Sequence, residues 1–121
     1  FTGQNSTLEP FGREWFYQDF TVPKNAKKIS FWWWQETYDT AKWDGFDAYI
    51  MDTSGNILQA LITNGGKPGT DYGTYWNTGG WKYVEADITA YQGQAIRIYF
   101  DQYLDGYGDQ TRTFVDDVKL Q

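Results

Sequence analysis

Three consecutive tryptophans occupy positions 32–34 of the chain, within the sequence SFWWWQ. Neighbouring side chains on a β-strand point to opposite faces of the sheet, so one core cannot hold all three indoles. Trp32 and Trp34 would share a face and lie roughly 6.6–6.8 Å apart along the strand. A flat aromatic strip beside a few polar side chains is a suitable surface for stacking a pyranose ring. The spacing therefore predicts a sugar platform.

Other strand-like segments place polar and aromatic side chains opposite an apolar row. Ile96, Ile98 and Phe100 form such a row, and Arg97 and Tyr99 then point to the other face. The predicted ligand-binding residues are Trp32, Trp34, Gln35, Asp47, Tyr49, Trp76, Arg97 and Tyr99.

A second interpretation of the tryptophan pair stays open. The long segment 63–80 contains Tyr72, Tyr75 and Trp76, and it is long enough to cover Trp32 and Trp34. Covered indoles would belong to the core, whereas exposed ones would form an apolar patch of the kind that marks an interaction site.

Aspartate and glycine recur in two short segments, DGFD at 44–47 and DGYGD at 105–109. This composition suits a loop that wraps oxygen atoms around a cation. Neither segment fits the twelve-residue EF-hand loop, because no glutamate follows at the required place. Ordinary Asp-Gly turns have the same composition more often, so both interpretations remain.

Turn signals rich in glycine, asparagine and proline divide the chain into short strand-like segments with no helical periodicity. This pattern favours a two-sheet antiparallel β-sandwich. At 121 residues we expect a single domain over 1–121. The predicted strands cover residues 15–22, 28–36, 46–51, 57–63, 81–87, 94–103 and 113–120.

Composition argues against several classes of function. The net charge of -6 disfavours a nucleic-acid partner, because phosphate binding depends on clustered lysine and arginine. The absence of histidine removes the usual triad base, and no cysteine is present to form disulfides or thiolate metal sites. No phosphate-binding loop or GxSxG motif occurs. We therefore expect a non-catalytic domain.

Nothing in the sequence predicts membrane insertion. No apolar run approaches the roughly 20 residues that cross a bilayer. The first ten residues, FTGQNSTLEP, lack the basic and apolar regions of a signal peptide. We expect a soluble domain excised from a larger multidomain protein.

The segments WFYQDFTVPKNAKKISFWWW, FDAYIMDTSGNIL, WKYVEADITAYQGQAIRIYFDQ and TFVDDVKL resemble MAM-like and carbohydrate-binding-module jelly-roll domains. The resemblance implies a jelly roll with its first and last strands adjacent, and an extracellular location beside a covalently linked catalytic domain of a secreted glycoside hydrolase or peptidase. It also implies a structural Ca²⁺ near the chain ends, with Asp116 and Glu9 as ligands.

Strand alternation gives a separate reason to expect a cation at Asp116. Phe114, Asp116 and Val118 share a row that we expect to face the core, where an unpaired carboxylate costs several kcal/mol unless it is neutralised. Calcium would neutralise the charge. The alternative is a salt bridge to Arg13, Arg97 or Arg112.

Three functions remain after these exclusions. The first is a carbohydrate-binding module that stacks polysaccharide on exposed aromatic side chains and carries a structural calcium. The second is a calcium-stabilised accessory or targeting domain of a secreted peptidase. The third is a protein-adhesion domain that buries the same aromatic patch against a partner.

Overall fold

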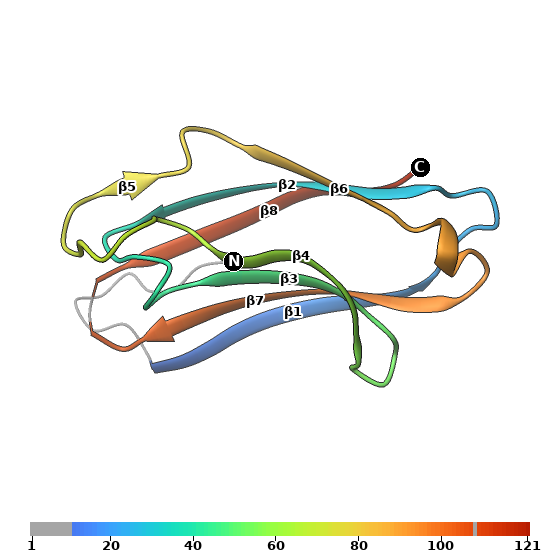
Figure 1. The fold of residues 1–121 in the computed structure, drawn as a ribbon, viewed down its shortest axis with the longest axis horizontal. Helices are drawn as coiled ribbons and strands as arrows, with labels where there is room; N and C mark the ends of the chain where they lie inside the picture. The colour runs from blue at the N-terminus through green and yellow to red at the C-terminus, as the bar shows by residue number, and fades with distance from the viewer. Residues whose placement is uncertain (1–10, 108) are drawn as a thin grey trace.

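Two antiparallel sheets pack face to face in the computed structural model, which describes residues 11–107 and 109–121 (Figure 1). The elements are β1 (Phe11–Thr21), β2 (Lys28–Thr37), β3 (Phe46–Met51), β4 (Ile57–Gly65), β5 (Trp76–Asn77), β6 (Lys82–Asp87), the 3-10 turn η1 (Thr89–Tyr91), β7 (Ala95–Asp105) and β8 (Thr111–Leu120). The predicted all-β sandwich is confirmed. Every predicted strand is present, with ends shifted by a few residues, and the two-residue β5 is an addition.

Strand order divides the elements into two layers. Sheet I has the order β1-β7-β3-β4, and in sheet II the central strand β2 pairs with β5 and β6 along one edge and with β8 along the other. In the described part of the chain β8 pairs with β2, while β1 pairs with β7. The adjacency of first and last strands that the resemblance implied is therefore not found among the described strands.

The core lies between the sheets and follows the predicted alternation in β2, β3 and β7. Phe31 and Phe100 are fully buried and meet edge to face, with ring centroids 5.1 Å apart. Trp33 points inward and stacks on Phe46 at 5.4 Å. The middle tryptophan of the triplet is thus a core residue, as predicted, and its neighbours lie on the outer face.

The predicted faces of the last strand are wrong. Val115 packs against the core, while Phe114 contacts the outward Trp34 and Asp116 is exposed. Phe114 and Asp116 do share a row, but the pairing of β8 with β2 sets them opposite the outward Trp34 and Trp32, so their row is the outer one. Alternation breaks only beyond Asp116, where the register shifts between Ser30 and Trp32. The expected energetic cost of a core-facing Asp116 carboxylate therefore does not arise.

Three loops meet at the end of the sandwich where β2 and β7 finish, on the left of Figure 1. Ala41 N–H donates to the carbonyl of Lys67, and Tyr38 N–H donates to the carbonyl of Gln110. The loop between β4 and β5 is thereby tied to the β2–β3 loop. No helix among the described residues has the length and apolarity needed to span a membrane.

Candidate functional site

The outer face of sheet II carries an open groove of about 410 Å³, lined by Trp32, Trp81, Asp116 and Asp117. Trp32 is 39% exposed and Trp81 is 48% exposed. Two indoles and two carboxylates therefore face solvent in one shallow, open site. Exposed aromatic rings beside hydrogen-bonding groups are the composition expected of a ligand-binding surface.

Strand pairing brings the groove residues together from distant parts of the chain. Trp32 lies at the centre of sheet II, opposite Tyr83 of β6 and Asp116 of β8. Directly opposed residues of an antiparallel pair share a face, so these side chains form one outward row. The rings of Trp32 and Tyr83 are in contact, with centroids 4.9 Å apart. Trp81, just before β6, extends the aromatic wall.

A backbone irregularity places two consecutive carboxylates at the same groove. Adjacent strand residues normally face opposite sides, yet Asp116 and Asp117 both line this site. Asp117 has a φ of 58°, a left-handed conformation that aspartate tolerates better than most residues. Its N–H donates to Asp116 Oδ1 at 2.8 Å.

The two carboxylates differ in their charge partners. Asp117 Oδ2 lies 3.2 Å from Lys119 Nζ, so its charge is compensated. Within residues 11–107 and 109–121, Asp116 forms no salt bridge with a basic side chain. The groove is therefore negatively charged beside its two indoles.

Comparison of the chain with known protein families and with curated proteins finds no match. The geometry of the molecule itself is the basis for assigning the site.

None of the other residues predicted around the tryptophan triplet is among those that line the groove. Trp34 is half-buried and packs on Phe114 at 5.4 Å. Gln35 is fully buried and donates to Thr113 Oγ1 at 3.0 Å, so it is not placed to contact a surface ligand. Trp76 of β5 pairs with the buried Thr37 and lies in a core-side row. The segment 63–80 thus crosses the end of β2 and leaves Trp32 exposed.

The remaining predicted ligand residues lie on the opposite side of the molecule, on the outer face of sheet I. Tyr17, Tyr99 and Tyr49 form a row across β1, β7 and β3, with ring centroids 6.2 and 6.5 Å apart. Desolvation raises the pKa of Tyr49 and Tyr99, because both are partly buried. Asp47 accepts the Asn64 N–H at 2.7 Å.

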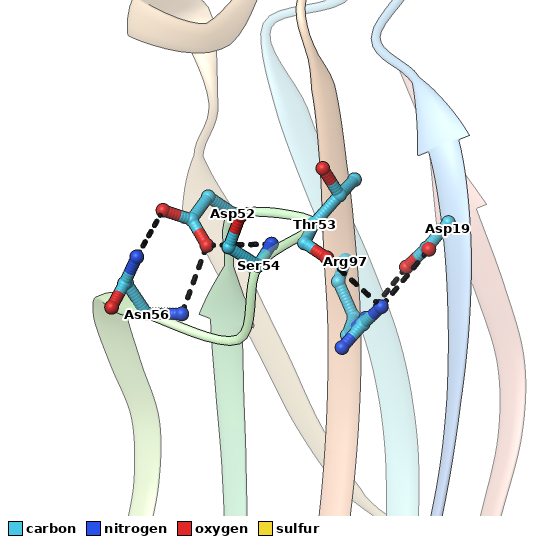
Figure 2. A network of polar contacts seen from close by, with 6 residues as sticks. All are labelled: Asp19, Asp52, Thr53, Ser54, Asn56 and Arg97. Carbon is cyan, nitrogen blue, oxygen red and sulfur yellow. Dashed lines mark hydrogen bonds and ion pairs between the residues drawn. The ribbon is translucent and has the colours of Figure 1, made fainter.

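Arg97 on this face is engaged by its own neighbours, as Figure 2 shows. Its guanidinium donates to both Asp19 oxygens, at 2.7 and 3.1 Å, and to the Thr53 carbonyl at 3.3 Å. It also stacks over Tyr17, 3.9 Å from the ring centroid. Hydrogen bonding to Arg97 lowers the pKa of Asp19. The polar groups here bind one another, which makes this face a weaker candidate for a ligand.

An acidic cluster occupies the loop end of the sandwich, where Asp39, Asp44 and Asp105 each offer an oxygen within 4.8 Å of the others. Asp39 is 2% exposed and Asp44 is 1% exposed. Asp44 accepts the Thr111 hydroxyl at 2.6 Å and the Asp105 N–H at 3.1 Å. These bonds tie the β2–β3 loop to the start of β8 and the end of β7.

A glycine beside the cluster, Gly45, allows the β2–β3 loop to pack closely against β4. A Cβ at Gly45 would lie 1.9 Å from Asn64 Oδ1 and 2.9 Å from the Ala41 carbonyl. Real side chains do not tolerate such contacts, so the DG pair at 44–45 allows the loop to fold against β4. The DGFD segment is thus more than a free surface turn.

The carboxylates of the cluster repel one another in a poorly hydrated site. Burial, and then the charges of Asp44, Asp105 and Asp109, raise the pKa of Asp39 to about 7, against the bond that it accepts from Thr40 N–H. A pocket of about 390 Å³ opens beside it, lined by Asp39, Trp43, Tyr72, Asp105, Tyr107 and Asp109. The site therefore favours any group that supplies positive charge.

The hydroxyl of Thr111 is central to the cluster, because it donates to Asp44 and lies 2.7 Å from Thr37 Oγ1. We expect Thr111→Val to lower the free energy of unfolding by about 2 kcal/mol, since it removes a buried donor to a charged group. Urea denaturation measures the change, with the exposed Thr63→Val as control. A loss no larger than that of Thr63→Val would show that the hydroxyl contributes little.

Sequence reasoning did not single out Trp81, Tyr83 and Asp117 at the groove, or Asp39 in the acidic cluster. Alternation in segment 81–87 does carry a signal for Trp81 and Tyr83, because Val84 and Ala86 face the core. Asp39 has no comparable local signal, since it joins the cluster only through the folded loops. Glu9 lies outside the described residues.

Proposed function

We propose that this domain is a non-catalytic glycan-binding module whose ligand stacks in the groove on the outer face of sheet II. The observation that carries the proposal is the pair of exposed indoles, Trp32 and Trp81, set beside the carboxylates Asp116 and Asp117 in one concavity. Indole faces pack against the apolar side of a pyranose, and carboxylates accept hydrogen bonds from its hydroxyls.

The groove is a better ligand site than the tyrosine row of sheet I. There, Arg97 and Asp47 already bind protein groups, and a ligand would have to displace those bonds. In the groove, Asp116 accepts one hydrogen bond, from the neighbouring Asp117 N–H, and its side chain is exposed to solvent. Replacing solvent by ligand hydroxyls costs less than breaking internal bonds.

A structural calcium ion is the second part of the proposal, at Asp39, Asp44 and Asp105 rather than at Asp116. Calcium prefers oxygen ligands at roughly 2.3–2.6 Å, so opposite ligands lie about 5 Å apart. Oxygens within 4.8 Å of one another are compatible with that geometry. The cation would neutralise two buried carboxylates. This cluster is also the specific support for a calcium-stabilised accessory domain as the second candidate function.

The resemblance to jelly-roll modules supports a wider setting for the domain. We place it in an extracellular multidomain protein, where it holds a covalently linked catalytic domain near its polysaccharide. Tethering raises the effective concentration of the catalytic domain at the polymer without new contacts in the active site.

Affinity electrophoresis through gels containing hydroxyethyl cellulose, xylan, mixed-linkage β-glucan or glycol chitosan tests the glycan-binding proposal. We expect at least one polymer to retard the domain. Trp81→Ala should weaken that retardation about tenfold, because it removes one wall of the groove.

Trp15→Ala provides the matched control for this experiment. Trp15 is a 59% exposed tryptophan on the opposite face, so its loss should leave retardation unchanged. If no polymer retards the domain, the proposed function is wrong. If Trp15→Ala rather than Trp81→Ala abolishes retardation, the ligand binds to sheet I instead.

A further inference from the structure

The charge of the groove specifies the kind of glycan more narrowly than its shape does. Asp116 stands opposite Trp32 in the register, and Trp81 and Asp117 complete the lining. We infer that the groove selects a cationic glycan, namely a polymer of amino sugars with free amines. The inference rests on the proposed function and names its substrate class.

Of the carboxylates around the groove, Asp116 alone has no basic partner among the described ion pairs. Glu85, in the next row, is bonded to Lys28 Nζ at 3.2 Å and to the Tyr83 hydroxyl at 2.8 Å. Asp117 is compensated by Lys119. Asp116 has no basic partner among the described ion pairs, and the chain as a whole carries a net charge of -6. A ligand ammonium can therefore pair with Asp116 without displacing a protein group.

The indoles add a second attraction for the same ligand. Tryptophan provides the best aromatic face for a cation, and an ammonium within about 6 Å of the ring is attracted by its quadrupole. An amino sugar presents both an apolar ring face and an ammonium substituent. A neutral sugar uses the first feature alone, and a uronic or sulfated sugar is repelled by the uncompensated Asp116.

A basic peptide is the other ligand with the same charge, and the edge of sheet II disfavours it. To lie beside Asp116 and Asp117, a peptide strand would have to add at the free edge of β8, because among the described strands β8 pairs only with β2. At Asp117 that edge is interrupted by a residue with a φ of 58° and by the register shift. Bulged edges resist strand addition, so the groove is suited to recognition through side chains.

Three β-1,4-linked hexamers that differ only at carbon 2 test the inference by isothermal titration calorimetry. They are the hexamers of glucosamine, N-acetylglucosamine and glucose. At mildly acidic pH and low salt we expect the glucosamine hexamer to bind about tenfold more tightly than the other two. Added sodium chloride should reduce this preference, because the contacts are solvent-exposed.

Variants separate a specific ion pair from a general charge effect. Asp116→Asn keeps the shape and one acceptor but removes the charge, and should reduce the preference to less than about threefold. Asp71→Asn removes one exposed charge that does not line the groove and should retain the tenfold preference. Loss of the preference in both variants would show a general charge effect and overturn the inference.

The outcomes distinguish this inference from the proposed function. Equal affinity for all three hexamers, with dependence on Trp81, would overturn the cationic selection and leave glycan binding in place. Tighter binding of an oligolysine of equal charge, with the same dependence on Asp116, would assign the groove to a basic peptide. Failure of every glycan in both experiments would overturn both proposals.

Discussion

Saturating calcium should raise the free energy of unfolding of this domain by about 4 kcal/mol when the free ion is about a thousandfold above its dissociation constant. For a domain of this size that corresponds to an increase of roughly 10–20 °C in the melting temperature. The physical reason is the burial of Asp39 and Asp44, whose charges a bound cation would neutralise. Thermal melts after dialysis against chelator, with and without added calcium, measure the effect.

Two aspartate variants locate the ion in the same experiment. Asp44→Asn keeps an oxygen that can accept from Thr111 but removes a charged ligand, so the increase should largely disappear. Asp116→Asn should retain the full increase, because Asp116 lies on the outer face of sheet II. If Asp116→Asn loses the increase and Asp44→Asn retains it, the ion binds at Asp116, as the jelly-roll resemblance implied. Identical melts with chelator and with calcium would exclude a stabilising ion at either place.

The parts of the fold that were predictable from sequence depend on local patterns. Apolar alternation in β2 and β7 assigned Phe31 and Phe100 to the core and Trp32 to the outer face. These side chains obey a period of two because both strands are long and regular at those positions. β5 escaped prediction because two residues contain no alternation, and the strand exists only through its pairing with β2.

The parts that were not predictable depend on contacts between distant segments. Strand order decides that Tyr83 and Asp116 flank Trp32, whereas Tyr99 and Arg97 lie on the other sheet. A single left-handed residue, Asp117, changes which side chains of β8 face outward. A pattern of residue types along one strand predicts neither the strand order nor the position of a bulge, because both depend on pairing with other strands.

The acidic cluster shows the same division between local and distant information. The DG pairs at 44–45 and 105–106 marked two tight turns that suit a cation site, and Asp44 and Asp105 do meet. Asp39 completes the group because the β2–β3 loop folds back over the end of the sandwich. Its burial arises from packing of loops that are far apart in sequence, and this burial is the main cause of its raised pKa.

The protonation of Asp39 leads to an expected pH dependence of stability in the metal-free domain. Its folded-state pKa of about 7 lies above the ordinary value of 3.8, so the folded protein binds more protons than the unfolded chain between these values. The free energy of unfolding should then fall as pH rises through this window and level off above about pH 7. At about 1.36 kcal/mol per pH unit, the loss reaches up to about 4 kcal/mol.

Urea denaturation between mildly acidic and mildly alkaline pH, in the presence of chelator, measures the part of this loss that falls in that range. Asp39→Asn cannot ionise, and its amide oxygen can still accept from Thr40 N–H, so most of the pH dependence should vanish in the variant. Hydrogen bonds from Arg97 and Asn56 lower the pKa values of Asp19 and Asp52 respectively. These two groups therefore make the domain less stable as pH falls, which is opposite to the effect of Asp39, and they do so at lower pH. Added calcium should also flatten the wild-type curve, because a bound cation favours ionised Asp39. Equal slopes for wild type and Asp39→Asn without metal would mean that Asp39 is already ionised in the folded domain at mildly acidic pH, and that its neighbours accommodate the charge without a cation.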